Sequence, residues 1–260
     1  MKNKSDDIQL LTFGGHLEML RKMLFRIVLV IVVFTILIFS FKEWTFQLLL
    51  APREWNFATY RCIEEFVRWC GFDFRFEPYQ IDLISTELAS QFMMHISSSV
   101  YLALLGASPY ILYELFRFIS PALYENEKKN IRWVFFFGTI MFFLGCAVGY
   151  FMVFPMTLRF LATYQLSANI TEQVSLDSYM DNFLMLIFVM GIVFEMPLVS
   201  WLLSKIGLLK RSFFHKYRRH AIVGLLVAAA FITPSSDPFT LGIVFFPLYG
   251  LFELSAFFVK

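Results

Sequence analysis

Charged residues are scarce in this chain of 260 residues: Asp, Glu, Lys and Arg make up 16%, whereas 58% of the residues are hydrophobic and 34 are Phe. A soluble domain of this length needs a larger polar fraction to cover its surface, so the composition predicts a membrane protein. The net charge of +2 decides little by itself. In a membrane protein, the distribution of Lys and Arg among the connecting segments is more informative.

Signatures of catalysis are also missing. The sequence has no Gly-x-x-x-x-Gly-Lys-Ser/Thr, His-Glu-x-x-His or Gly-x-Ser-x-Gly motif, so neither ATP hydrolysis nor zinc or serine chemistry has a basis in it. Cys62, Cys70 and Cys146 form no metal or redox motif. We therefore expect no enzyme, no cofactor and no metal. A disulfide between Cys62 and Cys70 stays open, although a straight helix would set them about 12 Å apart, too far to bridge.

The N-terminus lacks the features of a secretory signal peptide. Its first apolar run begins only after Lys2, Lys4, Asp6 and Asp7, and no small-residue cleavage site follows that run. We therefore expect the chain to begin in the cytosol.

Six apolar segments are candidates for membrane-spanning helices, which need about 20 mostly apolar residues each. They are Met23 to Phe41, Ile96 to Tyr113 with a start near Leu88, Trp133 to Phe154, Phe183 to Leu203, Ala221 to Ile232, and Leu241 to Phe258. Six spans place both termini on one side of the membrane. With the termini inside, only six of the 22 Lys and Arg residues fall in outer segments, namely Lys42, Arg53, Arg61, Arg68, Arg75 and Arg159. The positive-inside rule therefore predicts an all-α membrane protein with cytosolic termini, with a loop at 210–219 as its clearest cytosolic marker.

The last two segments are irregular. Ala221 to Ile232 has 12 residues (232 − 221 + 1), about 18 Å of helix, which is short for a hydrocarbon core of about 30 Å. Either the bilayer is thinner there, or the helix extends through Arg219 and Thr233. The sixth segment is interrupted by Pro247.

The first outer loop, Lys42 to Glu87, is too long for a simple turn. It carries apolar residues at helical spacing and an i,i+4 pair of Glu64 and Arg68, which predicts a short amphipathic helix on the outer face. The apolar residues are Tyr60, Ile63, Phe66, Val67 and Cys70.

Glu195 lies well inside the fourth segment, about 20 and 13 Å of helix from its two ends. An unpaired carboxylate at that depth costs about 2.5 kcal/mol or more, which makes Glu195 a candidate functional residue. Pro197 has no N–H to bond the carbonyl of Val193, so we expect a kink beside the acid. The alternative is a hydrogen bond between helices that only holds the bundle together.

The second cytosolic loop reads "FRFISPALYENEKK" and places acids beside the membrane surface. A carboxylate can bind an Arg guanidinium through two hydrogen bonds, so this loop is a candidate site for a basic peptide. The alternative is an ordinary solvated loop.

Two weaker signals remain. Gly145 and Gly149 form a Gly-x-x-x-Gly pair, a spacing that lets another helix approach closely. Glu253 lies near the cytosolic end of the sixth segment, where an acid can reach the headgroups, so we expect a boundary residue.

Taken together, these pieces resemble the TatC family, the multi-spanning core of the twin-arginine protein translocase. The resemblance runs in order over nearly the whole chain. It rests on "HLEMLR" at 16–21, Pro52, "SPYILYELFRFISPALYENE" at 108–127, "FFLGCAVGYFMVFP" at 142–155, "FEMP" at 194–197, "ITPSSDPFT" at 232–240 and "FFPLYGLFE" at 245–253.

The resemblance implies a function and a set of partners. TatC-like proteins recognise signal peptides with two adjacent arginines and initiate transport of folded proteins, powered by the proton-motive force. The implied partners are single-span TatA- and TatB-type proteins, signal peptides, membrane lipid and further copies of the chain, with no nucleic acid. We therefore expect a single TatC-like domain over 1–260 in the cytoplasmic membrane.

The resemblance also implies roles for individual residues. The signal-peptide site would contain Glu127, with Phe118, Pro121, Tyr124 and Glu125 from the same loop, and His16, Glu18 and Arg21 from the first segment. Glu195 with Pro197 resembles the family's intramembrane site for partner helices. Pro52 and Asp237 resemble outer-loop residues of the family.

One departure from the family pattern, His-Leu-x-Glu-Leu-Arg, affects this site. Met19 stands at the acid's position, and Glu18 stands one residue earlier. One residue turns a helical side chain by about 100°, so Glu18 does not automatically face the same peptide. We expect recognition to depend more on Glu127. The alternative function is a small secondary transporter or channel with Glu195 as its ion site, against which stands the lack of an inverted repeat.

Overall fold

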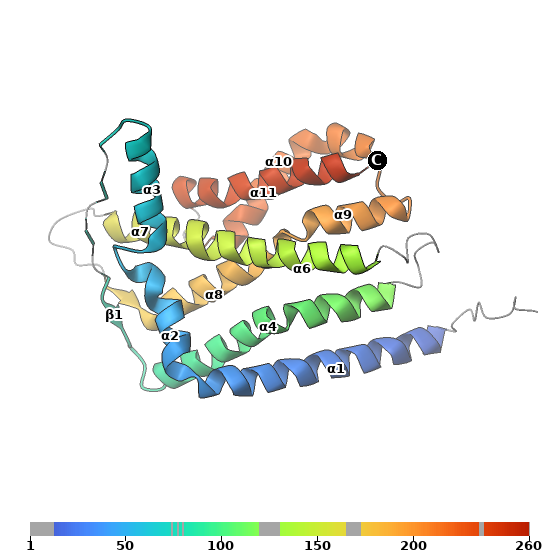
Figure 1. Ribbon diagram of the computed structural model, residues 1–260, viewed down its shortest axis with the longest axis horizontal. Coiled ribbons are helices and arrows are strands. Elements are labelled where there is room, and N and C mark those ends of the chain that lie inside the picture. Colours follow the sequence, from blue (N-terminus) through green and yellow to red (C-terminus); the bar gives the residue numbers. More distant parts are fainter. Residues whose placement is uncertain are drawn as a thin grey trace, which may run out of the picture.

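The computed structural model describes residues 13–73, 75–76, 78–79, 81–119, 131–164, 173–233 and 237–259. Most of these residues are helical, and the long helices run side by side as a bundle (Figure 1). Five helical stretches are long and apolar enough to cross a membrane: Leu17–Ser40, Ser90–Phe118, Trp133–Thr163, Leu176–Lys205 and Pro238–Phe258. The prediction of an all-α membrane protein is confirmed.

The first two of these stretches are single helices. Helix α1 spans Phe13–Ser40 and α4 spans Ser90–Ile119, so the second helix does begin well before Ile96. The two helices pack along each other (Figure 1). Large apolar side chains of α1, such as Phe25 at 70% and Ile36 at 64%, remain exposed, as expected of a surface that faces lipid.

The third and fourth stretches are each interrupted. Helix α6 (Ile131–Val148) continues through a π-helical turn η3 (Gly149–Val153) into α7 (Phe154–Thr163), which extends the predicted third segment beyond Phe154. Helix α8 (Leu176–Val193) is followed after a two-residue turn by α9 (Met196–Lys205). The bundle is centred on α8, whose buried side chains include Met180, Phe183 and Met190.

Two predictions about the C-terminal third were wrong. Helix α10 spans Arg211–Ile232, so most of the predicted loop at 210–219 is helical. Its 22 residues correspond to about 33 Å, which favours an extended helix over a thinned bilayer.

Helix α11 spans Pro238–Phe258 without interruption at Pro247. The missing N–H affects only the bond to the carbonyl of Ile243, and the surrounding turns remain helical.

The close approach predicted for Gly145 and Gly149 is confirmed. A Cβ added to Gly145 would lie 2.5 Å from the carbonyl oxygen of Met190, and one added to Gly149 would lie 3.1 Å from the Cα of Ile187. Both neighbours belong to α8. The glycines therefore let α6 and η3 pack directly against the α8 backbone.

A smaller layer covers one end of the bundle (Figure 1). It contains the predicted amphipathic helix α3 (Ala58–Trp69) and also α2 (Lys42–Leu50), the short helix η1 (Ala51–Arg53) and two short parallel strands, β1 (Leu83–Ile84) and β2 (Val174–Ser175). The hydroxyl of Tyr60 in α3 donates to the carbonyl of Pro155 at 2.8 Å, which fixes this layer to the bundle. Cys62 and Cys70 are free and exposed.

Candidate functional site

A pocket of about 350 Å³ lies between the beginning of α1 and the end of α4. Helix α1 lines it with Met19, Lys22, Met23 and Arg26, which share one face because their spacing is three or four residues. Helix α4 contributes Glu114, Arg117 and Phe118. The lining therefore combines apolar side chains of Met and Phe with one acidic and three basic side chains.

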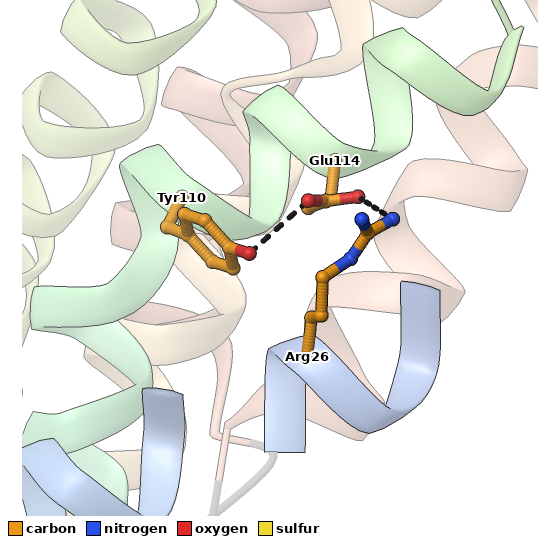
Figure 2. A network of polar contacts seen from close by, with 3 residues as sticks. All are labelled: Arg26, Tyr110 and Glu114. Atoms are coloured by element: carbon orange, nitrogen blue, oxygen red, sulfur yellow. Dashed lines mark hydrogen bonds and ion pairs between the residues drawn. The ribbon is translucent and has the colours of Figure 1, made fainter. Parts of the chain in front are cut away.

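Glu114 is the most deeply buried charged residue in the lining of this pocket, with only 3% of the residue exposed. Figure 2 shows its carboxylate between two donors. Arg26 Nη2 donates to Oε2 at 3.0 Å, and the hydroxyl of Tyr110 donates to Oε1 at 3.1 Å. Each carboxylate oxygen thus accepts one of these bonds, and α1 is joined to α4 through a charged pair.

Glu114 is not among the residues predicted from the sequence. It follows directly after the predicted second segment, which ends at Tyr113. A signal was present nonetheless: Tyr110 and Glu114 are four residues apart and therefore neighbours on one helical face, and Arg26 is a charge inside the first apolar segment.

Only some of the predicted signal-peptide residues lie at this pocket. Phe118 lines it, as does Met19. Glu18 is exposed and pairs with Lys22, with Glu18 Oε1 2.8 Å from Lys22 Nζ, and Arg21 is exposed; neither lines the pocket. Pro121, Tyr124, Glu125 and Glu127 lie outside the described residues, as does the side chain of His16.

Glu195 occupies the turn between α8 and α9. Its N–H donates to the carbonyl of Ile192 at 3.0 Å, and Pro197 stands in the first turn of α9, where a proline needs no N–H donor. The predicted interruption of the fourth helix beside this acid is therefore confirmed. The chain therefore leaves regular helical geometry at an acidic residue within the fourth apolar stretch.

The carboxylate of Glu195 is turned into the bundle. The residue is 9% exposed, and within the described part of the chain Oε1 is buried without a hydrogen-bond partner. A Cβ on Gly138 of α6 would lie 3.3 Å from Oε2, so this glycine makes room for the acid. These contacts do not favour the alternative of a hydrogen bond that merely ties two helices together.

An apolar groove of about 570 Å³ begins beside this turn. Its lining includes Phe137 and Met141 from α6, Pro197 and Trp201 from α9, and Leu254 from α11. Lys205 Nζ lies 5.5 Å from the centre of the Trp201 ring, which places a positive charge near the groove. An amphipathic or apolar helix with a polar group opposite Glu195 would fit this arrangement.

The two predicted outer-loop residues have visible structural roles. Pro52 is buried in η1. The side chain of Asp237 accepts hydrogen bonds from the N–H groups of Phe239 and Thr240 at 3.0 and 2.9 Å, which caps the start of α11.

Glu253 forms a second Arg–Glu–Tyr cluster, on α10 and α11. Arg218 Nη2 lies 2.5 Å from Oε2, and the hydroxyl of Tyr249 donates to Oε1 at 2.8 Å. The cluster repeats the four-residue Tyr–Glu spacing seen at Tyr110 and Glu114. It differs in burial, since 31% of the Glu253 side chain is exposed.

Comparison with known proteins gives concordant results. The family model of the Sec-independent protein translocase protein TatC matches residues 15–247. A TatC protein of Blattabacterium sp. subsp. Periplaneta americana (strain BPLAN) is 31% identical over 99% of this chain and 97% of its own length, and the TatC protein of Escherichia coli (strain K12) is 30% identical over 94% and 86%. Two crystal structures of a twin-arginine translocase receptor, TatC, one of them in DDM, have TM-scores of 0.75 and 0.77 at 29% identity, covering 94% of this chain and 97% and 99% of theirs.

Proposed function

This chain belongs to the TatC family of Sec-independent protein translocase proteins, and we propose that it is the receptor subunit that binds Arg-Arg signal peptides and initiates transport of folded proteins. In this proposal the proton-motive force powers transport. The family is a translocase component, so the chain contributes binding and positioning rather than a catalytic group.

One observation carries the receptor proposal: the two segments expected to form the signal-peptide face meet in one pocket. Met19 from α1 and Phe118 from α4 line the same cavity, and Arg26 is bonded to Glu114 across the helix interface. Helix α4 therefore ends beside the beginning of α1, and the sequence that follows α4 carries Glu125 and Glu127. Carboxylates suit a diarginine, because guanidinium and carboxylate pair through parallel hydrogen bonds.

A second surface is proposed to engage a partner helix of the TatA or TatB type. The turn that carries Glu195 leads into α9, and the groove lined by Phe137, Pro197 and Trp201 supplies an apolar surface next to it. A single-span partner with one polar residue at matching depth would satisfy the buried carboxylate. Further copies of this chain and of its partners would then form the transport path.

The proposed topology places the chain in the cytoplasmic membrane as one domain with six spans and both termini inside. The beginning of α1 and the end of α11 lie at the same end of the bundle, opposite α3 (Figure 1). The basic residues at the start of α10, among them Arg211, Lys216 and Arg219, fit a cytosolic position.

The receptor proposal is tested by site-specific photo-crosslinking in native-like membranes. Probes next to Glu127 should capture a signal peptide that carries Arg-Arg and should capture the Lys-Lys peptide much less. The adduct should disappear in Glu127→Gln, while a probe at Trp69, exposed on α3, should label neither peptide. Equal capture of both peptides would contradict the assignment.

The unpartnered Oε1 of Glu195 is the observation that would favour a small secondary transporter. In that case proteoliposomes of the purified chain would take up protons or cations, and Glu195→Gln would abolish the uptake. The receptor proposal expects no such uptake by the chain alone.

A further inference from the structure

The pocket between α1 and α4 has a charge distribution that a diarginine peptide would not meet easily. Lys22, Arg26 and Arg117 contribute three positive charges, and among the described lining residues Glu114 is the acid. Glu18 pairs with Lys22 on the exposed side of α1 and places no carboxylate in the lining of the pocket. A cationic ligand can therefore bind here only if it gains access to Glu114.

Access to Glu114 is controlled by Arg26. The carboxylate is almost fully buried, whereas 45% of the Arg26 side chain is exposed. The pair is held by one N–H bond, from Nη2 to Oε2, rather than by the two parallel bonds that a guanidinium can form with a carboxylate. Arg26 can thus turn away from the carboxylate toward its exposed side, while Glu114 stays in place on α4 with Tyr110.

We propose that Glu114 is a specificity-determining residue of the signal-peptide site, and that Arg26 occupies in the unbound protein the place that an arginine of the signal peptide takes. This inference rests on the proposed receptor function. The incoming guanidinium replaces Arg26 at Oε2, so the buried carboxylate remains paired before and after the exchange. A buried carboxylate left without a partner would be strongly unfavourable.

The exchange accounts for a preference for arginine over lysine. A guanidinium is planar and offers a fork of donors that matches both oxygens of a carboxylate, whereas an ammonium is a single strongly hydrated point charge. A lysine would have to lose its hydration inside the pocket and would form fewer oriented bonds. It would therefore compete less well with the resident Arg26.

The test measures binding of fluorescent signal peptides to the full-length chain in lipid nanodiscs. Glu114→Gln keeps the shape of the side chain and removes its charge, and should weaken binding of the Arg-Arg peptide by about tenfold, the scale of one charge-assisted hydrogen bond. Binding of the Lys-Lys peptide should change little.

Arg26→Gln removes the competitor and should strengthen Arg-Arg binding several-fold. This fold-change corresponds to the free energy of one partly exposed ion pair. In the double variant this gain should vanish, because there is no carboxylate left to free.

The second Arg–Glu–Tyr cluster supplies matched controls. Arg218→Gln and Glu253→Gln alter the same residue types in the same arrangement with Tyr249, yet away from the pocket. Both should leave the two peptide affinities unchanged. Thermal unfolding of every variant shows that it is folded before its affinity is compared.

The outcomes separate this inference from the function on which it rests. If the unaltered chain fails to prefer Arg-Arg over Lys-Lys, the receptor function itself is wrong. If it does prefer Arg-Arg and folded Glu114→Gln binds as well as the unaltered chain, only the role of Glu114 is wrong. Weaker Arg-Arg binding by folded Arg26→Gln would overturn the competitor role and would indicate that the basic residues of the pocket hold an anionic group, such as a lipid phosphate.

Discussion

Gly145 lies where α6 packs against the backbone of α8, and its lack of a side chain is a requirement of the packing. A Cβ there would meet the carbonyl oxygen of Met190 at 2.5 Å and the Cβ of Phe194 at 2.7 Å. Because backbone cannot move aside as a flexible side chain can, we expect Gly145→Ala to destabilise the protein by about 1–3 kcal/mol. Thermal unfolding in detergent micelles measures this loss.

Gly250 in α11 is the matched control for this prediction. Nothing lies within 4 Å of a Cβ placed there, so Gly250→Ala should leave the unfolding temperature unchanged or slightly raised, since alanine favours helix. An equal loss of stability in both variants would mean that the close contact is not what selects glycine at 145.

At the same scale, sequence patterns located some functional residues and missed others for identifiable reasons. Glu195 could be found because an acid in the middle of an apolar run stands out. Glu114 was missed, because it lies at a segment boundary and its importance depends on Arg26, 88 residues earlier. A pairing between distant positions leaves no periodic trace in either segment.

At the scale of elements, prolines have different effects according to their surroundings. Pro197 follows a break between α8 and α9, whereas Pro247 lies inside the continuous α11. We expect Pro197→Ala to restore a donor for the carbonyl of Val193 and to straighten the pair of helices. Spin labels at positions 181 and 206 should then move apart towards the roughly 37 Å of a straight helix.

Pro247→Ala serves as the control for this measurement, with the same pair of labels. That helix already continues through its proline, so the distance between positions 181 and 206 should not change. If Pro197→Ala also leaves it unchanged, the break is imposed by the packing of Glu195 against α6 and not by the proline.

Helix existence was predictable from apolar runs, and helix ends were not. The predicted third segment ended at Phe154, yet the helical chain continues to Thr163 because Pro155 can occupy the first turn of a new helix. The basic start of α10 is predicted as a loop because it lies between two apolar segments and is rich in Lys and Arg. In the fold, Phe214 of that stretch is buried against Phe252, and this distant contact stabilises a helical start that composition alone does not indicate.

At the scale of the whole molecule, the three native cysteines report on how the bundle sits in the membrane. Cys62 and Cys70 are exposed at the end covered by α3, and Cys146 is half-buried in α6. If that end faces outward, a membrane-impermeant maleimide added to intact spheroplasts should label the first two cysteines, and the signal should disappear in the double variant Cys62→Ser, Cys70→Ser.

To test the end of the bundle opposite α3, one cysteine is introduced in the turn between α9 and α10. Leu208 is 73% exposed, so Leu208→Cys in a chain without its native cysteines should be labelled in inverted vesicles and not in spheroplasts. This turn lies at the end of the bundle where α1 begins and α4 ends (Figure 1), and these two helix ends line the pocket of Glu114 and Arg26. If Leu208→Cys is labelled from outside, that pocket lies on the wrong side of the membrane for a signal peptide made in the cytosol. This result would contradict both the proposed topology and the receptor function.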